Sequence, residues 1–169
     1  MDLHLKGKKV FISGSTRGIG FETARLFLEE GATVIINGRT KKSVEAALSS
    51  LNSDNVSGLV ADFLKDSQVE TLIDQIPDDI DILVNNVGIF RGKEFKDENV
   101  DDWNDHFKVN LMSGVQLSKH FLPEMIKRNW GRIIFISSEC ATLVPIDLLS
   151  YSVSKASINV FSSGLAKLT

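Results

Sequence analysis

The stretch Ser13-Gly14-Ser15-Thr16-Arg17-Gly18-Ile19-Gly20 decides the fold of this chain. The β-branched and aromatic run before it predicts a buried strand, and residues 21–30 after it carry apolar side chains at helical spacing. A strand, a glycine-rich turn and a helix in this order direct backbone N–H groups and the positive end of a helix dipole toward an anion. The spacing G-x-x-x-G-x-G differs from the standard G-x-G-x-x-G. By itself, it therefore leaves open a glycine-rich turn that binds nothing.

The composition of the 169 residues is that of one globular domain, with 43% hydrophobic and 24% charged residues. A net charge of −3 argues against a nucleic-acid partner, which requires a basic face. No run approaches the ~18 apolar residues of a membrane span, and the first residues lack the apolar core of a signal peptide. The single cysteine, Cys140, excludes an intramolecular disulfide, and no Cys/His spacing indicates a metal site. We therefore expect a cytoplasmic protein with no metal and no membrane partner.

Strand and helix patterns alternate along the chain. The patterns predict strands at about 8–13, 33–36, 56–61, 80–84 and 132–137, and helices at about 18–30, 41–51, 67–76, 101–128 and 151–167. Thr40 is expected to cap the second helix, and the segment 67–70 has the capping-box form for the third. Pro123 is expected to bend or shorten the long fourth helix, whose apolar stripe includes Trp103 and Leu111.

This alternation predicts βαβ units with right-handed crossovers, and therefore an α/β fold with a doubly wound parallel sheet of the Rossmann type. Ligands of such folds bind beyond the carboxyl ends of the strands. The residues that follow the predicted strands are Gly14, Arg39, Asp62, Asn86 and Ser138. We expect them to lie together at one edge of the sheet.

Tyr151 and Lys155 stand four residues apart, so they share one face of the last predicted helix. A free tyrosine has a pKa near ~10, and a nearby ammonium lowers that pKa because it favours the phenolate. A tyrosine adjusted in this way can act as a general acid or base. Ser138 could hydrogen-bond to the same substrate oxygen. Taken alone, the pair also fits a solvated helix face, since such pairs are common on surfaces.

In combination, these motifs resemble the short-chain dehydrogenase/reductase family. The segments that carry the resemblance are the glycine turn at 13–20, Asp62, Asn85-Asn86-Val87-Gly88, Asn110, Ser137-Ser138 and Tyr151-Ser152-Val153-Ser154-Lys155. The general appearance is that of bacterial 3-oxoacyl-carrier-protein reductases or tropinone reductases. Two departures are Val87, where the family usually has alanine, and Ser13, where it usually has threonine.

The resemblance implies an NADP(H)-dependent oxidoreductase that interconverts a carbonyl group and a secondary alcohol. It implies that Tyr151 exchanges the proton, Ser138 polarises the carbonyl oxygen, Lys155 acts on Tyr151 and on the nicotinamide ribose, and Asn110 holds a water by distorting the long helix. The implied cofactor-binding residues are Gly14, Ser15, Thr16, Arg17, Gly18, Ile19, Gly20, Arg39, Asp62, Asn86, Gly88, Tyr151 and Lys155.

Cofactor choice follows from charge. Enzymes that use NAD carry an acid at the end of the second strand for the ribose 2′-hydroxyl, whereas this chain has Gly38 followed by Arg39. An arginine can bind a 2′-phosphate with its planar fork, and Arg17 is a second candidate cation. We therefore expect NADP(H) rather than NAD(H); the less favoured alternative is that Arg39 is a solvated loop charge.

The sequence gives less information on the chemical class of the substrate. The loop 140–149 is largely apolar and borders the predicted site, which favours an apolar or acyl-type carbonyl substrate or, alternatively, packing against further chain. Cys140 lacks an evident base, so we do not expect a thiol nucleophile. His4, His106 and His120 are scattered along the chain, so we expect packed or solvated roles for them rather than metal binding.

Members of the family continue beyond the Tyr/Lys helix with two further strands and a substrate-covering loop. We expect residues 1–169 to form one dinucleotide-binding domain, incomplete at its C-terminal end. If the chain were complete, an inactive NADP(H)-binding module or a partner subunit would become the alternative. The family also pairs the helices at 101–128 and 151–167 between subunits, which implies a homodimer or homotetramer.

Overall fold

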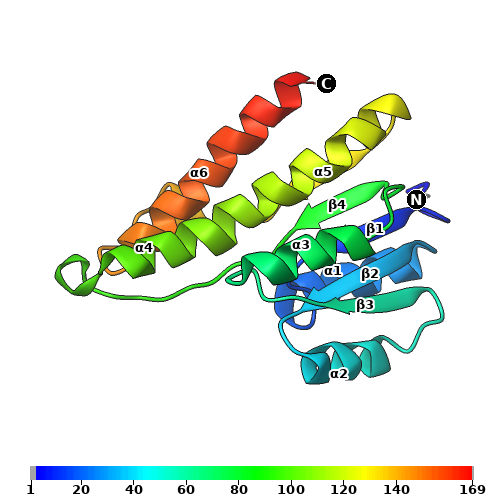
Figure 1. Cartoon of the computed structure of the whole chain (residues 1–169), viewed down its shortest axis with the longest axis horizontal. Coiled ribbons are helices and arrows are strands. Elements are labelled where there is room, and N and C mark those ends of the chain that lie inside the picture. Colours follow the sequence, from blue (N-terminus) through cyan, green and yellow to red (C-terminus); the bar gives the residue numbers. More distant parts are fainter. Residues whose placement is uncertain (1–2, 169) are drawn as a thin grey trace.

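The computed structural model describes residues 3–168 and contains one parallel sheet flanked by helices (Figure 1). Its five strands lie in the order β3-β2-β1-β4-β5, and each neighbouring pair is parallel. This order confirms the predicted doubly wound α/β fold. The strands are β1 (Lys9–Ile12), β2 (Thr33–Gly38), β3 (Val56–Val60), β4 (Ile82–Asn85) and β5 (Arg132–Phe135).

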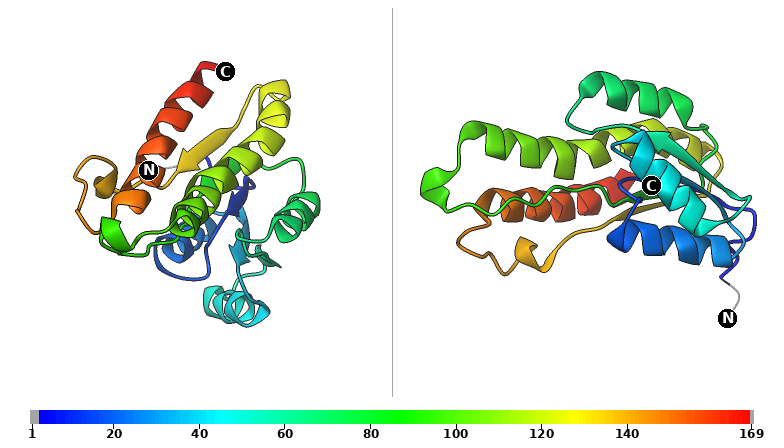
Figure 2. Two further views of the ribbon diagram at one scale, coloured as in Figure 1. Left: turned by 60° about the vertical axis from the view of Figure 1, so that its left-hand side comes forward. Right: turned by 90° about the horizontal axis from the view of Figure 1, so that it is seen from below.

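The helices cover both faces of the sheet. They are α1 (Gly18–Glu29), α2 (Lys41–Leu51), α3 (Asp66–Gln75), α4 (Val100–His106), α5 (Ser113–Lys127) and α6 (Leu149–Leu165). Core residues of α1 and α2 pack on one face, and those of α3 and α5 pack on the other. The long helices α5 and α6 lie side by side (Figures 1 and 2).

The core explains why β1 is apolar throughout. Val10 and Ile12 belong to the layer beneath α1 and α2, whereas Phe11 belongs to the layer beneath α3 and α5, and all three are fully buried. Successive side chains of a strand point to opposite faces, so a strand covered on both sides has no polar face. This central strand therefore delivers the glycine turn at its carboxyl end to a fixed place.

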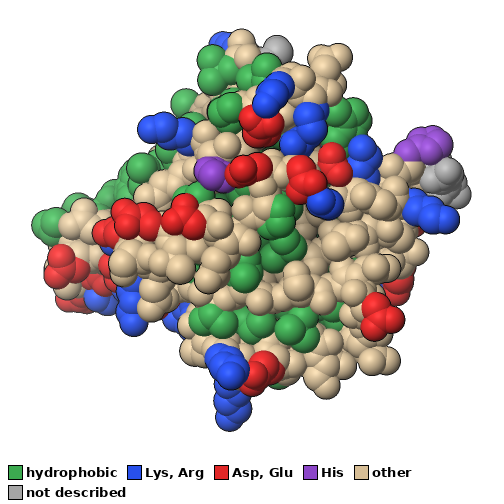
Figure 3. All heavy atoms as spheres, turned by 45° about the vertical axis from the view of Figure 1, so that its right-hand side comes forward, with side chains coloured by type: hydrophobic (Ala, Val, Ile, Leu, Met, Phe, Trp, Pro, Cys, Tyr) green, Lys and Arg blue, Asp and Glu red, His purple; other side chains and the backbone are tan. Residues whose placement is uncertain are grey.

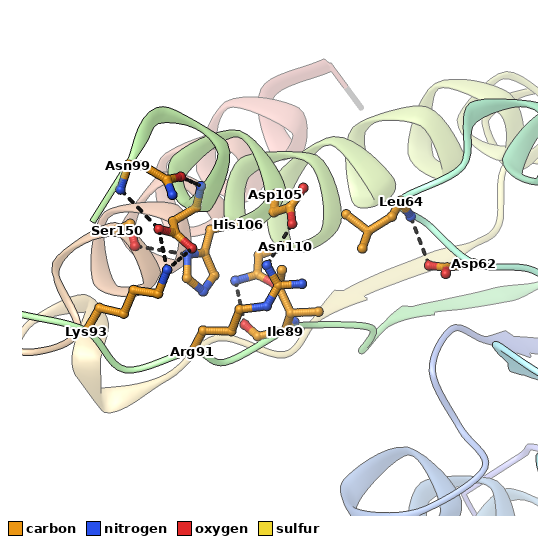
Figure 4. Close-up of polar contacts among 11 residues, drawn as sticks. Asp62, Leu64, Ile89, Arg91, Lys93, Asn99, Asp105, His106, Asn110 and Ser150 are labelled. Carbon is orange, nitrogen blue, oxygen red and sulfur yellow. Dashed lines mark hydrogen bonds and ion pairs between the residues drawn. The ribbon is translucent and has the colours of Figure 1, made fainter. Parts of the chain in front are cut away.

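Two of the predicted helix starts need correction. Helix α3 begins at Asp66 with Lys65 at its N-cap and no capping side chain, so the predicted capping box at 67–70 is wrong. The reason is a turn in which the Asp62 carboxylate accepts the N–H of Leu64, so the chain is already turned before Ser67 (Figure 4). Helix α6 begins at Leu149, two residues earlier than expected. Thr40 caps α2 as predicted, through the N–H of Ser43.

The long predicted helix consists of three segments. Helix α4 is joined to α5 by a π-helical stretch, Phe107–Met112, and the three form one continuous rod (Figure 1). Pro123 lies inside α5 and does not end it. Among the described residues, no helix is long and apolar enough to cross a bilayer, and no group of three or more potential ligands gathers for a metal ion.

Charged side chains are spread over the surface. On the face drawn in Figure 3, acidic and basic side chains are interspersed and hydrophobic side chains are exposed between them. This distribution agrees with the small net charge of −3.

Candidate active site

The glycine turn has a backbone that only glycine adopts readily. Gly14 has φ +61° and Gly18 has φ +58°. A Cβ added to Gly14 would lie 2.8 Å from the Cα of Val87, whereas one added to Gly18 would meet nothing within 4 Å. Arg17, the N-cap of α1, supplies no capping side chain, so the first N–H groups of this helix are available. An open approach and unpartnered N–H groups at a helix N-terminus fit a phosphate group.

Ser13 and Asn86 hold the turn against the end of β4. The Ser13 hydroxyl accepts the N–H groups of Asn86 and Val87, both at 3.0 Å. The Asn86 amide donates to the carbonyl of Gly14 at 2.8 Å, and a Cβ on Gly20 would lie only 2.4 Å from that amide nitrogen. The Asn86 side chain therefore supports the glycine turn. The Ser13 hydroxyl is an essential part of this junction.

Asn37 is a supporting residue that sequence reasoning missed. It lies at the end of β2, is 1% exposed, and its side-chain oxygen accepts the N–H of Gly14 at 3.1 Å. Its backbone exchanges two hydrogen bonds with Ser15, since its N–H donates to the Ser15 hydroxyl and its carbonyl accepts the Ser15 N–H. The one sequence feature that could have identified Asn37 is an amide side chain at the end of an apolar strand.

The two predicted phosphate-binding arginines lie at this end of the sheet. Gly38, which precedes Arg39, packs so closely on the turn that an added Cβ would lie 2.4 Å from the Thr16 methyl group. Arg39 and Arg17 are both exposed, and within residues 3–168 neither guanidinium group makes a hydrogen bond or ion pair. Asp62 follows the adjacent strand β3 and is half-buried.

Asn110 connects the segment after β4 to the helix that carries Tyr151. Its side-chain oxygen accepts the N–H of Ile89 at 2.7 Å, and its amide nitrogen donates to the Ile89 carbonyl at 3.1 Å (Figure 4). The same nitrogen donates to the Ser154 hydroxyl at 2.9 Å, which donates to the Tyr151 carbonyl at 2.6 Å. Asn110 lies in the π-helical stretch, so the expected distortion of the long helix is confirmed.

Lys155 is a buried ammonium group at the centre of this region. It is 5% exposed, and its Nζ donates to the carbonyl of Ile136 at 2.8 Å. Burial lowers the pKa of Lys155 from 10.5 to about 8, because the interior disfavours the charged form. A Cβ on Gly88 would lie 3.5 Å from the Lys155 Nζ and 3.3 Å from the Asn110 oxygen. The glycine therefore allows the backbone after β4 to approach both groups closely.

Tyr151 and Ser138 occupy the two segments that follow β5. Tyr151 is half-buried in the first turn of α6, and its ring contacts the rings of Phe90 and His106 edge to face, with centroids 5.1 and 6.1 Å apart. Ser138 caps a short 3₁₀ turn, Glu139–Ala141, by accepting the N–H of Cys140. The predicted residues thus form two groups at one edge of the sheet, one at the glycine turn and one around Lys155.

Comparisons with known proteins agree with this geometry. The family model for short chain dehydrogenase matches residues 8–169. The chain is 43% identical over 172 residues to the uncharacterized oxidoreductase YvrD of Bacillus subtilis, covering all of this chain and 65% of that protein. It is 35% identical over 173 residues to the 3-oxoacyl-[acyl-carrier-protein] reductase FabG of Aquifex aeolicus, covering 99% of this chain and 70% of that protein.

A solved structure has a similar fold. A gluconate 5-dehydrogenase from Burkholderia cenocepacia, crystallised in complex with NADP and tartrate, superposes with a TM-score of 0.85 and 30% identity over 96% of this chain and 66% of that one. The chain thus spans about two thirds of the length of the relatives that it matches. The family model covers the chain from the glycine turn through the Tyr151 helix, and the chain belongs to the short-chain dehydrogenase family.

Proposed function

We propose that this chain forms the nucleotide-binding and catalytic part of an oxidoreductase that transfers hydride between NADP(H) and a carbonyl or secondary alcohol group. The buried ammonium of Lys155 carries the proposal, because it lies one helical turn after Tyr151 and beside Gly88, where an added Cβ would lie 3.5 Å from its Nζ. Within residues 3–168, this ammonium donates to a single backbone carbonyl, that of Ile136. Burying a cation with so few partners costs free energy unless the cation serves a ligand or a reaction.

The residues around Lys155 have complementary roles in this proposal. Bound NADP(H) supplies or accepts the hydride. Tyr151 donates the proton to the carbonyl oxygen in reduction and accepts it in oxidation. Lys155 favours the phenolate form of Tyr151 and offers N–H donors to the ribose, while the Ser138 hydroxyl orients the substrate oxygen. Asn110 fixes the Tyr151 turn through Ser154, and it holds a water for the return of the proton.

The test of turnover is oxidation of NADPH in the presence of a panel of ketones that includes a β-ketoacyl thioester. Ketone-dependent loss of NADPH absorbance supports the proposal. Exposed apolar side chains near the site favour apolar members of the panel, and three of them are Phe90, Leu143 and Ile146, which are 64%, 72% and 90% exposed. Faster turnover of short, charged ketones than of apolar ones would contradict this substrate class.

Cofactor preference is tested at Arg39. Because the guanidinium groups of Arg39 and Arg17 have no partner within residues 3–168, they can meet a 2′-phosphate without breaking an ion pair. Arg39→Ala is expected to weaken NADPH binding about tenfold or more and to leave NADH binding unchanged. The control is Arg25→Ala, since Arg25 is already paired with Glu22 and Glu29. Wild-type Kd values for NADH equal to or below those for NADPH would contradict the preference.

A module that binds NADP(H) without turnover is the second candidate. The chain spans 65% of the length of YvrD, so the residues needed for turnover need not all lie within residues 1–169. Tight NADPH binding with no oxidation of NADPH by any ketone would favour this candidate. A chain that neither binds NADPH nor oxidises it with any ketone would contradict both candidates.

We also propose that the chain forms a homodimer or homotetramer through α5 and α6. A shallow apolar groove between these helices is lined by Leu111, Val115, Val153, Val160 and Phe161, and Val160 is 76% exposed. Sedimentation of the wild type and of Val160→Asp tests this surface. A monomeric wild type would contradict it.

A further inference from the structure

The helix that carries Tyr151 starts without a cap of its own. Its N-cap residue is Leu148, which has no side-chain hydrogen-bond acceptor, and the first turn contains no acidic residue. The first N–H groups of a helix need acceptors, and a carboxylate at this end is also favoured by the helix dipole. Any acceptor must therefore come from another part of the chain.

Glu98, in the loop before α4, supplies that acceptor across 52 residues of sequence. One of its oxygens accepts the backbone N–H of Ser150 at 3.3 Å and also the hydroxyl proton of the same serine. Ser150 is fully buried and immediately precedes Tyr151. The carboxylate thus fixes both the backbone and the side chain at the residue before the proposed proton donor.

The hydroxyl proton of Ser150 determines the state of His106. A serine hydroxyl can donate one hydrogen bond, and an ionised carboxylate only accepts, so the Ser150 hydroxyl donates its hydrogen bond to Glu98. The Nδ1 of His106, 2.9 Å from the same hydroxyl, must then be the donor (Figure 4). His106 is fully buried, and this burial lowers its pKa, with a further contribution from Arg91 that Glu98 opposes. The ring is therefore neutral, with its proton on Nδ1.

The position of His106 is fixed independently by α4. Asn99 and Asp102 form a reciprocal capping box at the start of this helix, and Lys93 pairs with the Asp102 carboxylate (Figure 4). His106 ends the same helix and places its ring edge to face against that of Tyr151. The Tyr151 ring is thus contacted by a group that is itself hydrogen-bonded to the preceding residue.

We infer that the half-buried Glu98 and the buried Ser150 and His106 form a positioning unit that sets the place of Tyr151 for proton transfer. This inference rests on the proposed function, and it assigns positioning rather than proton exchange to the three residues. A displacement of about 1 Å in a reacting group can cost about a hundredfold in rate, so a fixed Tyr151 has a measurable effect.

The decisive comparison is Glu98→Gln against Glu98→Ala. Both remove the charge, but only glutamine keeps a side-chain oxygen that can accept both bonds from Ser150. We expect Glu98→Ala and Ser150→Ala to lower kcat for ketone reduction about tenfold to a hundredfold, with KM for NADPH unchanged. Glu98→Gln should stay within about threefold of the wild type. The control is Ser118→Ala, which removes a fully buried hydroxyl from α5, away from this unit.

A second readout does not require turnover. Tyr151 is the only tyrosine of the chain, so the rise of phenolate absorbance with pH reports this residue alone. We expect the curves of wild type, Glu98→Gln and Ser118→Ala to coincide and those of Glu98→Ala and Ser150→Ala to be displaced. Melting temperatures identify any variant that fails to fold.

These outcomes separate the two proposals. A wild type without turnover contradicts the proposed function, and the phenolate curves then decide the inference. Coincident curves for Glu98→Gln and Glu98→Ala, or equal kcat losses in the two variants, would overturn the inference. Both variants lack the charge of Glu98, and only Glu98→Gln keeps a side-chain oxygen that can hold Ser150 in place.

Discussion

The buried ammonium of Lys155 predicts how the stability of the protein depends on pH. The pKa of this group falls from 10.5 to about 8 on folding, because the side chain is 5% exposed. At about 1.4 kcal/mol per unit, this shift corresponds to about 3 kcal/mol at most. The folded chain releases the proton near pH 8 and the unfolded chain only near 10.5, so the unfolded chain binds more protons between these values. The contribution of Lys155 to stability therefore increases as pH rises through this window.

The perturbation is Lys155→Met, which removes the titrating group and keeps an unbranched side chain. The loss of the bond to the Ile136 carbonyl shifts the free energy of unfolding by an amount that does not vary with pH. The difference between wild type and variant isolates the ionisation. We expect it to change by up to about 3 kcal/mol in favour of the wild type from about pH 7 to about pH 11.

Urea unfolding without cofactor, followed by tryptophan fluorescence at several pH values, measures this difference. Lys41→Met is the matched control, since the Lys41 side chain is 83% exposed and should give a difference that is flat with pH. A flat difference for Lys155→Met as well would refute the reasoning, because it would mean that the ammonium is not held out of water.

Three further outcomes follow from the site geometry. Ser13→Ala should lower the free energy of unfolding by about 2 kcal/mol in urea unfolding, since the N–H groups of Asn86 and Val87 lose their acceptor; an unchanged midpoint would contradict this role. Gly14→Ala should cost more stability than Gly18→Ala, because only the Gly14 Cβ meets backbone, at 2.8 Å, while both have positive φ; the reverse order in thermal melts would refute it. Asn110→Ala should lower stability by about 2 to 4 kcal/mol through the loss of the bonds to Ile89 and Ser154, with equal melting temperatures as the contrary result.

Local pattern was sufficient to predict the frame of the molecule. The apolar run of β1, the glycine turn and the repeated strand-helix alternation fixed the parallel sheet, because each is a short-range signal with one structural solution. The end of α1 also has a local cause, because Gly31 has φ +80° just after the helix and glycine adopts this conformation readily. Helix starts were less reliable. The cap of α6 lies 52 residues away in sequence, and no local rule can find it.

The buried polar residues were the part that sequence could not provide. On the long helical rod, the apolar residues Trp103 and Leu111 are only half-buried, whereas His106 and Asn110 are buried. Their partners, Ser150 and Ile89, come from other elements, so their burial is decided by tertiary contacts. Reading the histidines as scattered and packed or solvated agreed with the burial of His106 but gave no indication of its place beside Tyr151.

The most direct test of the central claim compares the wild type with Tyr151→Phe in ketone-dependent oxidation of NADPH, with NADPH binding measured in parallel. We expect turnover to fall about a thousandfold or more while the Kd for NADPH changes little, because the variant loses only the hydroxyl that exchanges the proton. Full activity in Tyr151→Phe would show that Tyr151 is not the proton donor.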